Sequence, residues 1–434
     1  MSVLQKYPRP VNIIALINFI AFALLYIYQK PLDNYIILAG LLIIGIIYLS
    51  DMLMTKLNYE DEILFLIVSM LSSVGIIIIY RLDPDLGVKQ VIWFMTGVTL
   101  FFCTAGLYGK FKFWDRIIYL YPLVSIVLFI LTLLLGIKVK GSTNWIQIGR
   151  FSFQPSEIIK LLFVFFMAAY YRHPEKLAIS NFKLKEWDIT IDHKYVFVFL
   201  VYLHMGFLVI QKELGTLLLF FLIYVIFLYV FDCNLKFLLT NIGIAFFGAL
   251  TSVAFLHHVQ VRVEAWLNPW ADIAGKGYQI TQSLFAIGSG GFFGTGIGLG
   301  QPEYIPEVHT DFIFSAICEE MGVFGGIAVI LLYLILLYRG IKITLSAKKL
   351  FYRAVALGIT AMFGFQSFII IGGVIRLIPL TGITLPFISY GGSSLTTSFV
   401  ALGILQAISL KSFGEEEACE SEPEGEAEGE QENN

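Results

Sequence analysis

The sequence predicts an all-α integral membrane protein, a polytopic bundle of about 12 transmembrane helices with a large extracellular loop. Of its 434 residues, 58% are hydrophobic and 14% are charged, whereas soluble domains are about half apolar and about a quarter charged. The mean hydropathy of +0.80 agrees with this class. The apolar residues also gather into runs of about 20, the length that crosses the hydrocarbon core of a bilayer.

Twelve such runs follow one another along the chain, and short connections separate most of them. The first run is not expected to be a cleaved signal, because it is long and no small-residue cleavage site follows it. The predicted spans cover residues 11–29, 35–50, 62–80, 90–108, 116–137, 157–171, 195–210, 214–231, 236–256, 311–338, 350–372 and 386–410.

The distribution of Lys and Arg predicts the orientation of these spans. If both termini are cytoplasmic, 18 of these residues lie on the inner side, ten lie outside and Lys160 lies within a span. Cytoplasmic loops carry the excess of positive charge in membrane proteins. We therefore expect a multi-pass protein with both termini in the cytoplasm.

The end of the chain has a different composition. Residues 414–434 contain ten Glu and no Lys or Arg, which is typical of a solvated, disordered segment. Without these ten charges the formal net charge rises from -3 to +7, so the membrane part is mildly basic, as suits anionic or phosphorylated lipids. We expect the membrane core to end at residue 412 and an acidic cytoplasmic tail to cover 413–434.

Two predicted extracellular loops, 138–156 and 258–310, are much longer than the other connections. Loops of this length usually carry function. In the second, YQITQSLFAIG predicts a short interfacial helix with Phe285 and Ile287 turned to lipid. The glycine-rich GGFFGTGIGLG then predicts flexible backbone near a lipid headgroup, and its glycine spacing does not match a nucleotide fingerprint.

Several classes of chemistry have no support in the sequence. There is no Walker motif, no HExxH, no GxSxG and no His/Cys metal cluster, which argues against an ATPase, a metalloprotease or a serine hydrolase. The four cysteines have no metal-binding or disulfide spacing and are interpreted as small buried hydrophobic residues. Nothing in the pattern indicates a nucleic acid partner.

Ionisable residues in or beside membrane spans are costly and are therefore candidates for function. Glu157 and Lys160 share one face of a predicted helix. They form either an intrahelical ion pair or a polar wall with Lys160 available for a phosphate. Lys212 and Glu213, in QKELGT, either occupy a solvated turn or line the same outward cavity.

Two further groups flank the later spans. Arg262 and Lys276 lie near Trp266, in a stretch typical of the membrane interface, where they either anchor the loop or hold a pyrophosphate. Arg376 precedes a Pro- and Gly-rich stretch that extends to Ser393. This pattern is typical of a broken helix that lines a cavity, or of close helix packing by small residues.

The stretch IPEVHTDFIF puts His309, Thr310 and Asp311 at the start of a predicted span. Thr310 or Asp311 is expected to cap that helix, because the helix dipole favours a carboxylate there. A carboxylate held at this height in an outward cavity is also suited to act as a general base, and the two roles are compatible. Glu319 and Glu320, deeper in the same span, indicate a polar cavity or an internal partner.

Five stretches recur in a known order: NWIQIGRFSFQPSEIIK, QKELGT, NPWAD…GKGYQITQS…IGSGGFFGTGIG, IPEVHTDFIFSAICEEMG and LIPLTGITLPFISYGGSS. In these motifs the chain resembles the SEDS family (shape, elongation, division and sporulation), to which the RodA, FtsW and SpoVE proteins belong. The similarity covers roughly residues 60–412 and is far more specific than a single short pattern. The family core has ten spans, so residues 1–59 look like an extra N-terminal two-helix segment.

The resemblance implies a peptidoglycan glycosyltransferase that polymerises lipid II at the outer face of the bacterial cytoplasmic membrane, in elongation, division or sporulation. It also implies a complex with a class B penicillin-binding protein, which cross-links the strands. The aspartate of the HTDF motif, here Asp311, is implied to be the essential catalytic residue. The candidate substrate-binding residues are Trp145, Glu157, Lys160, Glu213, Arg262, Lys276, His309, Thr310 and Ser393.

The chain departs from the family pattern at secondary positions. Asn144 stands where an arginine commonly precedes the tryptophan, Lys212 and Glu213 change QPDLGT to QKELGT, and Ile370 replaces an asparagine. None of these changes touches Asp311. They leave open which residues bind the substrate and which subfamily the chain represents.

The mechanism that the resemblance implies is inverting glycosyl transfer from a donor sugar α-linked to undecaprenyl pyrophosphate, with formation of β-1,4 bonds. Asp311 takes the proton from the 4-hydroxyl of the acceptor. Cations stabilise the leaving pyrophosphate, and Arg262, Lys276, Lys160 or a bound divalent cation (Mg²⁺ or Mn²⁺) remain alternatives. One catalytic carboxylate is enough here, in contrast to the pair used in sugar hydrolysis.

Two other classes of protein are alternatives. Charged groups near span ends and broken helices also suit a flippase or transporter of lipid-linked cell-wall precursors. However, no repeat relates the two halves, and the polar groups gather at the outer face rather than at the bilayer midplane. A scaffold for the division or elongation machinery would leave Asp311 without a purpose.

Overall fold

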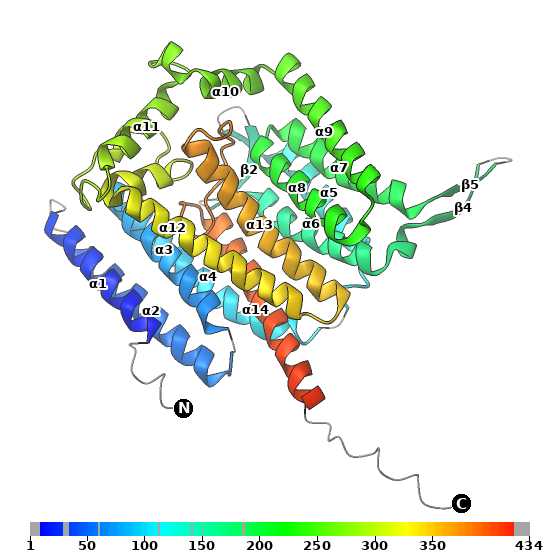
Figure 1. The fold of residues 1–434 in the computed structure, drawn as a ribbon, viewed down its shortest axis with the longest axis horizontal. Coiled ribbons are helices and arrows are strands. Elements are labelled where there is room, and N and C mark those ends of the chain that lie inside the picture. The colour runs from blue at the N-terminus through cyan, green and yellow to red at the C-terminus, as the bar shows by residue number, and fades with distance from the viewer. Residues whose placement is uncertain are drawn as a thin grey trace, which may run out of the picture.

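The computed structural model describes residues 9–28, 34–59, 61–111, 113–139, 142–149, 151–184 and 187–420. Within these ranges, twelve long helices occupy the twelve predicted spans (Figure 1), so the prediction of a polytopic helical membrane protein is confirmed. The helices are α1 (Pro10–Tyr28), α2 (Asn34–Lys56), α3 (Glu62–Leu82), α4 (Pro84–Tyr108), α5 (Leu120–Leu135), α6 (Pro155–Arg172), α7 (His193–Gln211), α8 (Leu214–Phe227), α9 (Leu235–Phe255), α12 (Ile313–Ser346), α13 (Leu350–Val374) and α14 (Gly392–Glu420).

Ten of these helices are long and apolar enough to cross a membrane. The other two are α5, which has 16 residues, and α6, which carries the charged residues Glu157, Lys160 and Arg172. α5 packs against α6, and α6 packs against α13. Both therefore belong to the bundle and complete the set of twelve.

Burial separates the inner helices of the bundle from the outer ones. In α3, 89% of the most apolar stretch is buried, whereas in α9 the share is 11%. Small residues let inner helices approach closely: a Cβ on Gly97 of α4 would overlap Phe399 of α14, and one on Gly403 would overlap Thr104. These contacts fix α4 against α14, and the first turns of both helices border the candidate site.

One end of the bundle carries most of the irregular structure. Figure 1 shows α10 and α11 at the end opposite the start of α1 and the end of α14, and we call it the loop end. A three-stranded antiparallel sheet in the order β1–β2–β3 lies between α5 and α6 in the chain. The remaining elements are β1 (Ile137–Val139), β2 (Ser142–Ile148), β3 (Phe151–Phe153), η2 (Pro174–Leu177), β4 (Ile179–Leu184), β5 (Trp187–Ile191), η3 (Leu228–Asp232), α10 (His257–Leu267), η4 (Pro269–Asp272), α11 (Tyr278–Gly290) and η5 (Pro302–Tyr304).

The predicted short helix in the long loop is present as α11. Phe285 is exposed as expected, whereas Ile287 packs against the core because it lies on the face of α11 that covers the bundle. The glycine-rich segment that follows is held in place: the backbone N–H groups of Thr295 and Gly296 donate to the carbonyls of Glu319 and Glu320. These bonds anchor the segment to α12, and its flexibility near a lipid headgroup stays a prediction.

The last span begins later than predicted. Residues 375–391 are irregular, and α14 starts only at Gly392. Arg376 and Phe387 have positive φ angles of 64° and 66°, which a continuous helix cannot accommodate. The segment is packed into the protein, and the Tyr333 hydroxyl donates to the carbonyl of Pro386. The predicted broken backbone is thus present, and its residues reach the cavity described next.

Candidate functional site

A polar cavity of about 770 Å³ opens at the loop end of the bundle. Its walls come from the first turns of α4, α8 and α14, from α6 and α10, from β2, and from the segments on either side of Asp311 and Gly382. Nine of the ten predicted site residues line it: Trp145, Glu157, Lys160, Glu213, Arg262, His309, Thr310, Asp311 and Ser393.

Asp311 lies in a tight turn just before α12 rather than at its N-cap. Its backbone N–H donates to the carbonyl of Glu307 at 3.1 Å, and Glu307 has a φ of 58°. The N-cap is Phe312, with no side-chain capping bond. The expectation that Thr310 or Asp311 caps the helix is therefore wrong, and Thr310 instead donates from Oγ1 to the carbonyl of Glu307. The Asp311 carboxylate faces the cavity.

Arg262 of α10 lines the same cavity and lies close to Asp311. Its Nη1 donates to the carbonyl of Thr381 at 2.8 Å. A Cβ placed on Gly382 would lie 3.5 Å from Asp311 Oδ2 and 3.8 Å from Arg262 Nη2, so both charged groups converge on this glycine. Burial lowers the pKa of Arg262, and the attraction of Asp311 opposes that effect. The pair thus presents one anion and one anchored cation to the cavity.

The irregular segment before α14 holds the turn of Asp311 in position. Ser389 donates from Oγ to the carbonyl of Thr310 at 2.6 Å, and the N–H of Tyr390 donates to the carbonyl of His309 at 2.8 Å. The rings of His309 and Tyr390 meet edge to face, with centroids 5.9 Å apart. The segment before α14 and the turn before α12 are far apart in the sequence, and the bonds between them fix the position of the Asp311 carboxylate.

Glu157 and Lys160 form the predicted ion pair, with 2.8 Å between Oε2 and Nζ, and both side chains are buried. Lys160 also donates to Gln366 Oε1 at 3.2 Å, and Gln366 donates to the carbonyl of Thr384 at 2.8 Å. The pair lines the cavity as well, so the ion pair and the polar wall coexist. This chain of bonds ties α6 and α13 to the segment beside Gly382.

The α7–α8 turn separates two neighbouring charges. Glu213 is buried, and Gln154 donates to its Oε1 at 3.3 Å. Burial raises the pKa of the Glu213 carboxyl, while the hydrogen bond from Gln154 opposes the shift. Lys212 is exposed and adopts a left-handed conformation with φ 61°. The solvated-turn alternative is therefore wrong for Glu213, and both residues line the cavity.

Lys276 is not part of the cavity lining. Its Nζ bonds Glu264 Oε2 at 2.8 Å, and both side chains are exposed. The hydrogen bond and charge of Glu264 raise the pKa of Lys276. The expected position of Lys276 at the substrate is therefore wrong, because η4 and the following turn carry it away from the cavity.

Arg376 has a supporting position. Its Nε donates to the carbonyl of Trp266 at 2.8 Å and its Nη2 to that of Leu267 at 2.7 Å. In return, Trp266 Nε1 donates to the carbonyl of Arg376 at 3.2 Å. These bonds fasten the end of α10, and with it Arg262, to the start of the irregular segment.

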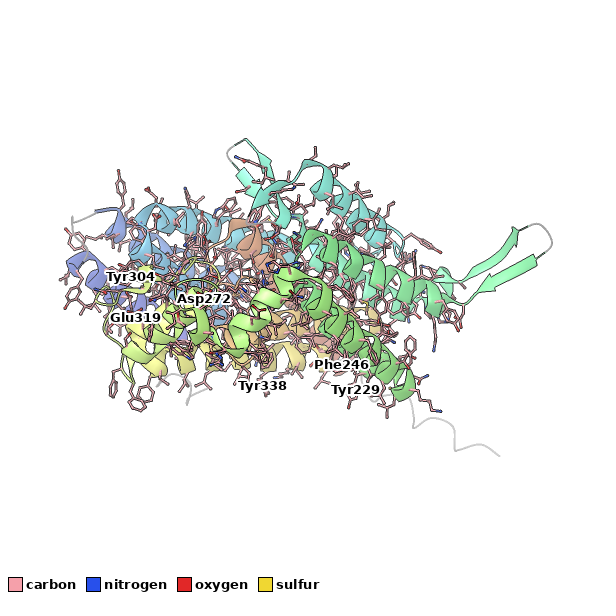
Figure 2. The ribbon with its side chains drawn as sticks, turned by 90° about the horizontal axis from the view of Figure 1, so that it is seen from above. Tyr229, Phe246, Asp272, Tyr304, Glu319 and Tyr338 are labelled. Carbon is pink, nitrogen blue, oxygen red and sulfur yellow. The ribbon has the colours of Figure 1, made fainter. Side chains whose placement is uncertain are left out.

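Glu319 and Glu320 have the internal partners that the sequence suggested as one alternative. Glu320 forms a buried salt bridge with Arg81 of α3, and Arg81 also pairs with Glu303 at 3.1 Å. Glu319 Oε1 accepts the N–H of Gln301 at 2.8 Å. Figure 2 labels Glu319 of α12 and Tyr304 of η5 in the same part of the molecule, and α12 packs against η5. These carboxylates hold the segment around Gln301 against α12, outside the cavity lining.

Sequence reasoning missed several cavity residues, among them Lys89, Gln366 and Gly382. Lys89 is in the first turns of α4, outside the predicted span. Gln366 is a polar residue in the middle of a span, a signal that was available. Gly382 has a φ of 74°, which no pattern of hydrophobicity reveals.

A divalent cation was one expected source of positive charge. Across the described ranges, no group of three or more His, Cys, Asp or Glu side chains is arranged to hold a metal ion. The cavity carboxylates Glu157 and Glu213 are already bonded within the protein. The positive charges that the described chain itself brings to the cavity are those of its Arg and Lys side chains.

The fold and the site define a class: a polytopic helical membrane protein whose loop end holds a cavity with a carboxylate, a guanidinium and lysines. Comparison with known proteins then identifies the family. Residues 61–413 match the Cell cycle protein family of FtsW, RodA and SpoVE, and the chain belongs to this family.

Two curated relatives illustrate the similarity. The peptidoglycan glycosyltransferase RodA of Mycobacterium tuberculosis is 34% identical over 382 residues, which cover 81% of this chain and 78% of the relative. Stage V sporulation protein E of Bacillus subtilis is 35% identical over 378 residues, which cover 82% of this chain and 98% of the relative.

Solved structures share the fold. A chain of a peptidoglycan synthase complex that coordinates polymerization and crosslinking gives a TM-score of 0.65 at 24% identity, covering 81% of this chain and 97% of that chain. The crystal structure of the rod shape determining protein RodA of Thermus thermophilus gives 0.58 at 25% identity, covering 82% and 98%.

Proposed function

We propose that this protein is a peptidoglycan glycosyltransferase that polymerises lipid II into β-1,4 glycan strands at the outer face of the bacterial cytoplasmic membrane. One observation carries the proposal: a carboxylate, Asp311, and an anchored guanidinium, Arg262, meet in a polar cavity of a chain from this family. The names of the relatives support glycosyl transfer as the reaction.

In this mechanism Asp311 accepts the proton of the acceptor's 4-hydroxyl as that oxygen attacks the anomeric carbon of the donor. The new carbon–oxygen bond forms as the bond to the pyrophosphate oxygen breaks, so the configuration inverts from α to β. The electron pair of the broken bond stays with the pyrophosphate, and Arg262 stabilises its charge. The proton on Asp311 then passes to water.

The remaining cavity residues have binding roles in this proposal. Trp145 offers an aromatic face to a sugar, and Ser393 offers a hydroxyl whose Oγ is buried without a partner in the described chain. Lys160, Glu157 and Glu213 form a polar wall that is already ordered before the substrate arrives. His309 and Thr310 orient the Asp311 carboxylate through the turn that they share with it.

The membrane setting follows from the same proposal. The start of α1 and the end of α14 lie at one end of the bundle (Figure 1), which supports a location of both on the side of the membrane away from the cavity. The excess of Lys and Arg predicted for that side favours the cytoplasm. A class B penicillin-binding protein is the proposed partner, since a solved relative is part of a synthase complex. Residues 1–59 are proposed as an added segment outside the glycosyltransferase core of 60–412.

The test is polymerisation of lipid II by the purified protein and by an Asp311→Asn variant. Loss of a positioned general base is expected to slow strand formation by about 10²–10⁴-fold. Asp272→Asn is the matched control, because Asp272 lies on the same loop but outside the cavity lining. A lipid-scrambling assay on the same preparations tests the flippase alternative. Normal strand formation by Asp311→Asn would overturn the assignment of the base.

A further inference from the structure

Gln90 is a buried amide in the second turn of α4, directly after the cavity residue Lys89. Only 1% of Gln90 is exposed, and it lies outside the cavity lining. Its Nε2 donates to the carbonyl of Ser389 at 3.2 Å, and its Oε1 accepts the N–H of Gly391 at 3.5 Å. The side chain therefore bridges α4 to the irregular segment that precedes α14.

The carbonyl that Gln90 holds belongs to the peptide group between Ser389 and Tyr390. The N–H of that same peptide group donates to the carbonyl of His309 at 2.8 Å. Because the C=O and N–H of a peptide group lie in one plane, a rotation that breaks the bond to Gln90 also breaks the bond to His309. Gln90 thus fixes the peptide group through which this segment reaches the turn of Asp311.

A second bond from the segment holds the peptide group directly before Asp311. Ser389 Oγ donates to the carbonyl of Thr310 at 2.6 Å and accepts the N–H of Leu385 at 2.9 Å. The two peptide groups that lead into Asp311 are therefore both bonded to neighbouring residues of the segment before α14. A continuous path of hydrogen bonds connects Gln90 to the backbone that carries the carboxylate.

Close packing against α3 and α4 holds the segment in place as a whole. A Cβ on Gly75 of α3 would lie 2.3 Å from the carbonyl oxygen of Ile388, and one on Gly392 would lie 2.3 Å from the ring of Trp93 of α4. Packing of this kind fixes where the chain runs, whereas the orientation of the peptide groups between residues 388 and 392 depends on their hydrogen bonds. Gln90 supplies such a bond from α4.

A purely structural role for Gln90 is the alternative. Irregular backbone inside a membrane protein needs partners for its N–H and C=O groups, and a buried amide side chain provides them. In that case the loss of Gln90 would lower stability and would disturb the whole cavity wall, so that substrate binding and catalysis would suffer alike. The two roles therefore predict different kinetics.

We propose that Gln90 is a positioning residue for the reaction: through the segment before α14 it holds the carboxylate of Asp311 where the acceptor hydroxyl arrives. This inference rests on the proposed function for the role of Asp311 as the base, whereas the positioning itself is a property of the fold. Without Gln90 the turn shifts and the proton has farther to pass. The chemical step is slower, and the binding of lipid II is unchanged.

The experiment measures kcat and KM for lipid II with the purified full chain and with Gln90→Met, which has a similar volume and no hydrogen-bonding amide. We expect kcat to fall about 10-fold to 10²-fold while KM stays within about twofold. In an Asp311→Asn background, Gln90→Met is expected to lower the residual rate by less than about twofold, since no base remains to be positioned. An equal loss in both backgrounds overturns the proposal.

Hydrogen–deuterium exchange of residues 305–314 tests the positioning without an assay of activity. The N–H groups of Thr310 and Asp311 both donate to the carbonyl of Glu307, and Gln90→Met is expected to speed their exchange about tenfold or more. Unchanged exchange overturns the proposal. Faster exchange in a chain that does not polymerise lipid II upholds the positioning by Gln90 and rejects the proposed function instead.

Gln406→Met is the matched control. Gln406 is a fully buried glutamine of α14 outside the cavity lining, and its amide has no partner within the described residues. Its variant is expected to keep the kcat, the KM and the exchange rates of the parent. Thermal unfolding shows whether each variant folds. Gln90→Asn replaces Gln90→Met if that variant does not fold, because an amide one methylene shorter cannot reach Ser389 and Gly391 together. Parent values of kcat and exchange in Gln90→Asn would likewise overturn the proposal.

Discussion

The guanidinium of Arg262 and the carboxylate of Asp311 converge on Gly382, although α10 and the turn before α12 stand at opposite ends of the long loop. Arg262 is held by the carbonyls of Thr381 and Leu380, and Asp311 is held by its own turn. Each charge is therefore positioned independently of the other, as a preorganised site requires.

Arg262 tests this arrangement directly. Arg262→Gln is expected to lower the rate of strand formation from lipid II by about 10²-fold, as loss of one fixed charge-stabilising group does. Arg262→Lys is expected to recover only part of the rate, because an ammonium cannot hold the carbonyl of Thr381 and face Asp311 with a planar fork. A rate for Arg262→Gln within about twofold of the parent would exclude this role.

Substitutions in the Glu157–Lys160 pair distinguish its contribution to folding stability from its contribution to activity. Lys160→Met leaves a buried carboxylate without its partner, which is expected to cost about 3–5 kcal/mol of folding free energy. The double variant Glu157→Gln/Lys160→Met is expected to recover most of that stability but not the polymerase activity, since the polar wall is gone. Thermal unfolding in detergent and the lipid II assay measure the two effects. If the double variant is as active as the parent, the pair has no part in substrate binding.

Substitution of Glu213 is expected to stabilise the folded protein at high pH. Burial raises the pKa of Glu213 in the folded protein. Above this folded-state pKa the ionised carboxylate destabilises the fold. As the pH falls from the folded-state pKa to the lower pKa of the unfolded chain, this destabilisation disappears. Glu213→Gln is therefore expected to raise the unfolding temperature by about 1–3 °C near pH 8 and to lose this advantage toward pH 5. Thermal scans of both proteins across this range are the measurement. A pH-independent difference would show that Glu213 folds in its ionised form.

Substitution of Arg376 is expected to displace Arg262 from its position without unfolding the protein. Arg376→Ala removes the bonds that fasten the end of α10, so the displaced Arg262 is expected to lower activity about tenfold. Limited proteolysis is expected to cut within residues 257–277 faster than in the parent. Arg172→Ala serves as the control, because Arg172 is exposed and ends α6 on the side of the bundle away from the cavity. Equal proteolysis rates for Arg376→Ala and the parent would contradict this account.

The spans were predictable because apolar runs of bilayer length are a local property of the sequence. Even α6, with its charged pair, was recognisable from the length of its apolar run. Glu157 and Lys160 were predictable as an ion pair for the same reason, since a three-residue spacing on a helix sets the contact. Asp311 stood out because a carboxylate at a span end is costly, and the family resemblance added the expectation of catalysis.

Other features depend on contacts that no local pattern contains. Lys276 looked equivalent to Arg262, yet the path of η4 turns it toward Glu264 and away from the cavity. The capping role expected for Asp311 failed because Glu307 adopts a positive φ and closes a different turn.

By itself, the sequence determined the membrane class, the twelve helices and nine of the residues that line the cavity. Only the tertiary structure decided which cations reach Asp311 and which are paired elsewhere. The physical reason is that hydrophobic length and spacing act within one helix, whereas the balance of charges in a cavity is a sum over elements far apart in the chain. Gly382 shows the difference: it is one glycine among 38 in the sequence, and in the fold it is the point where Arg262 and Asp311 meet.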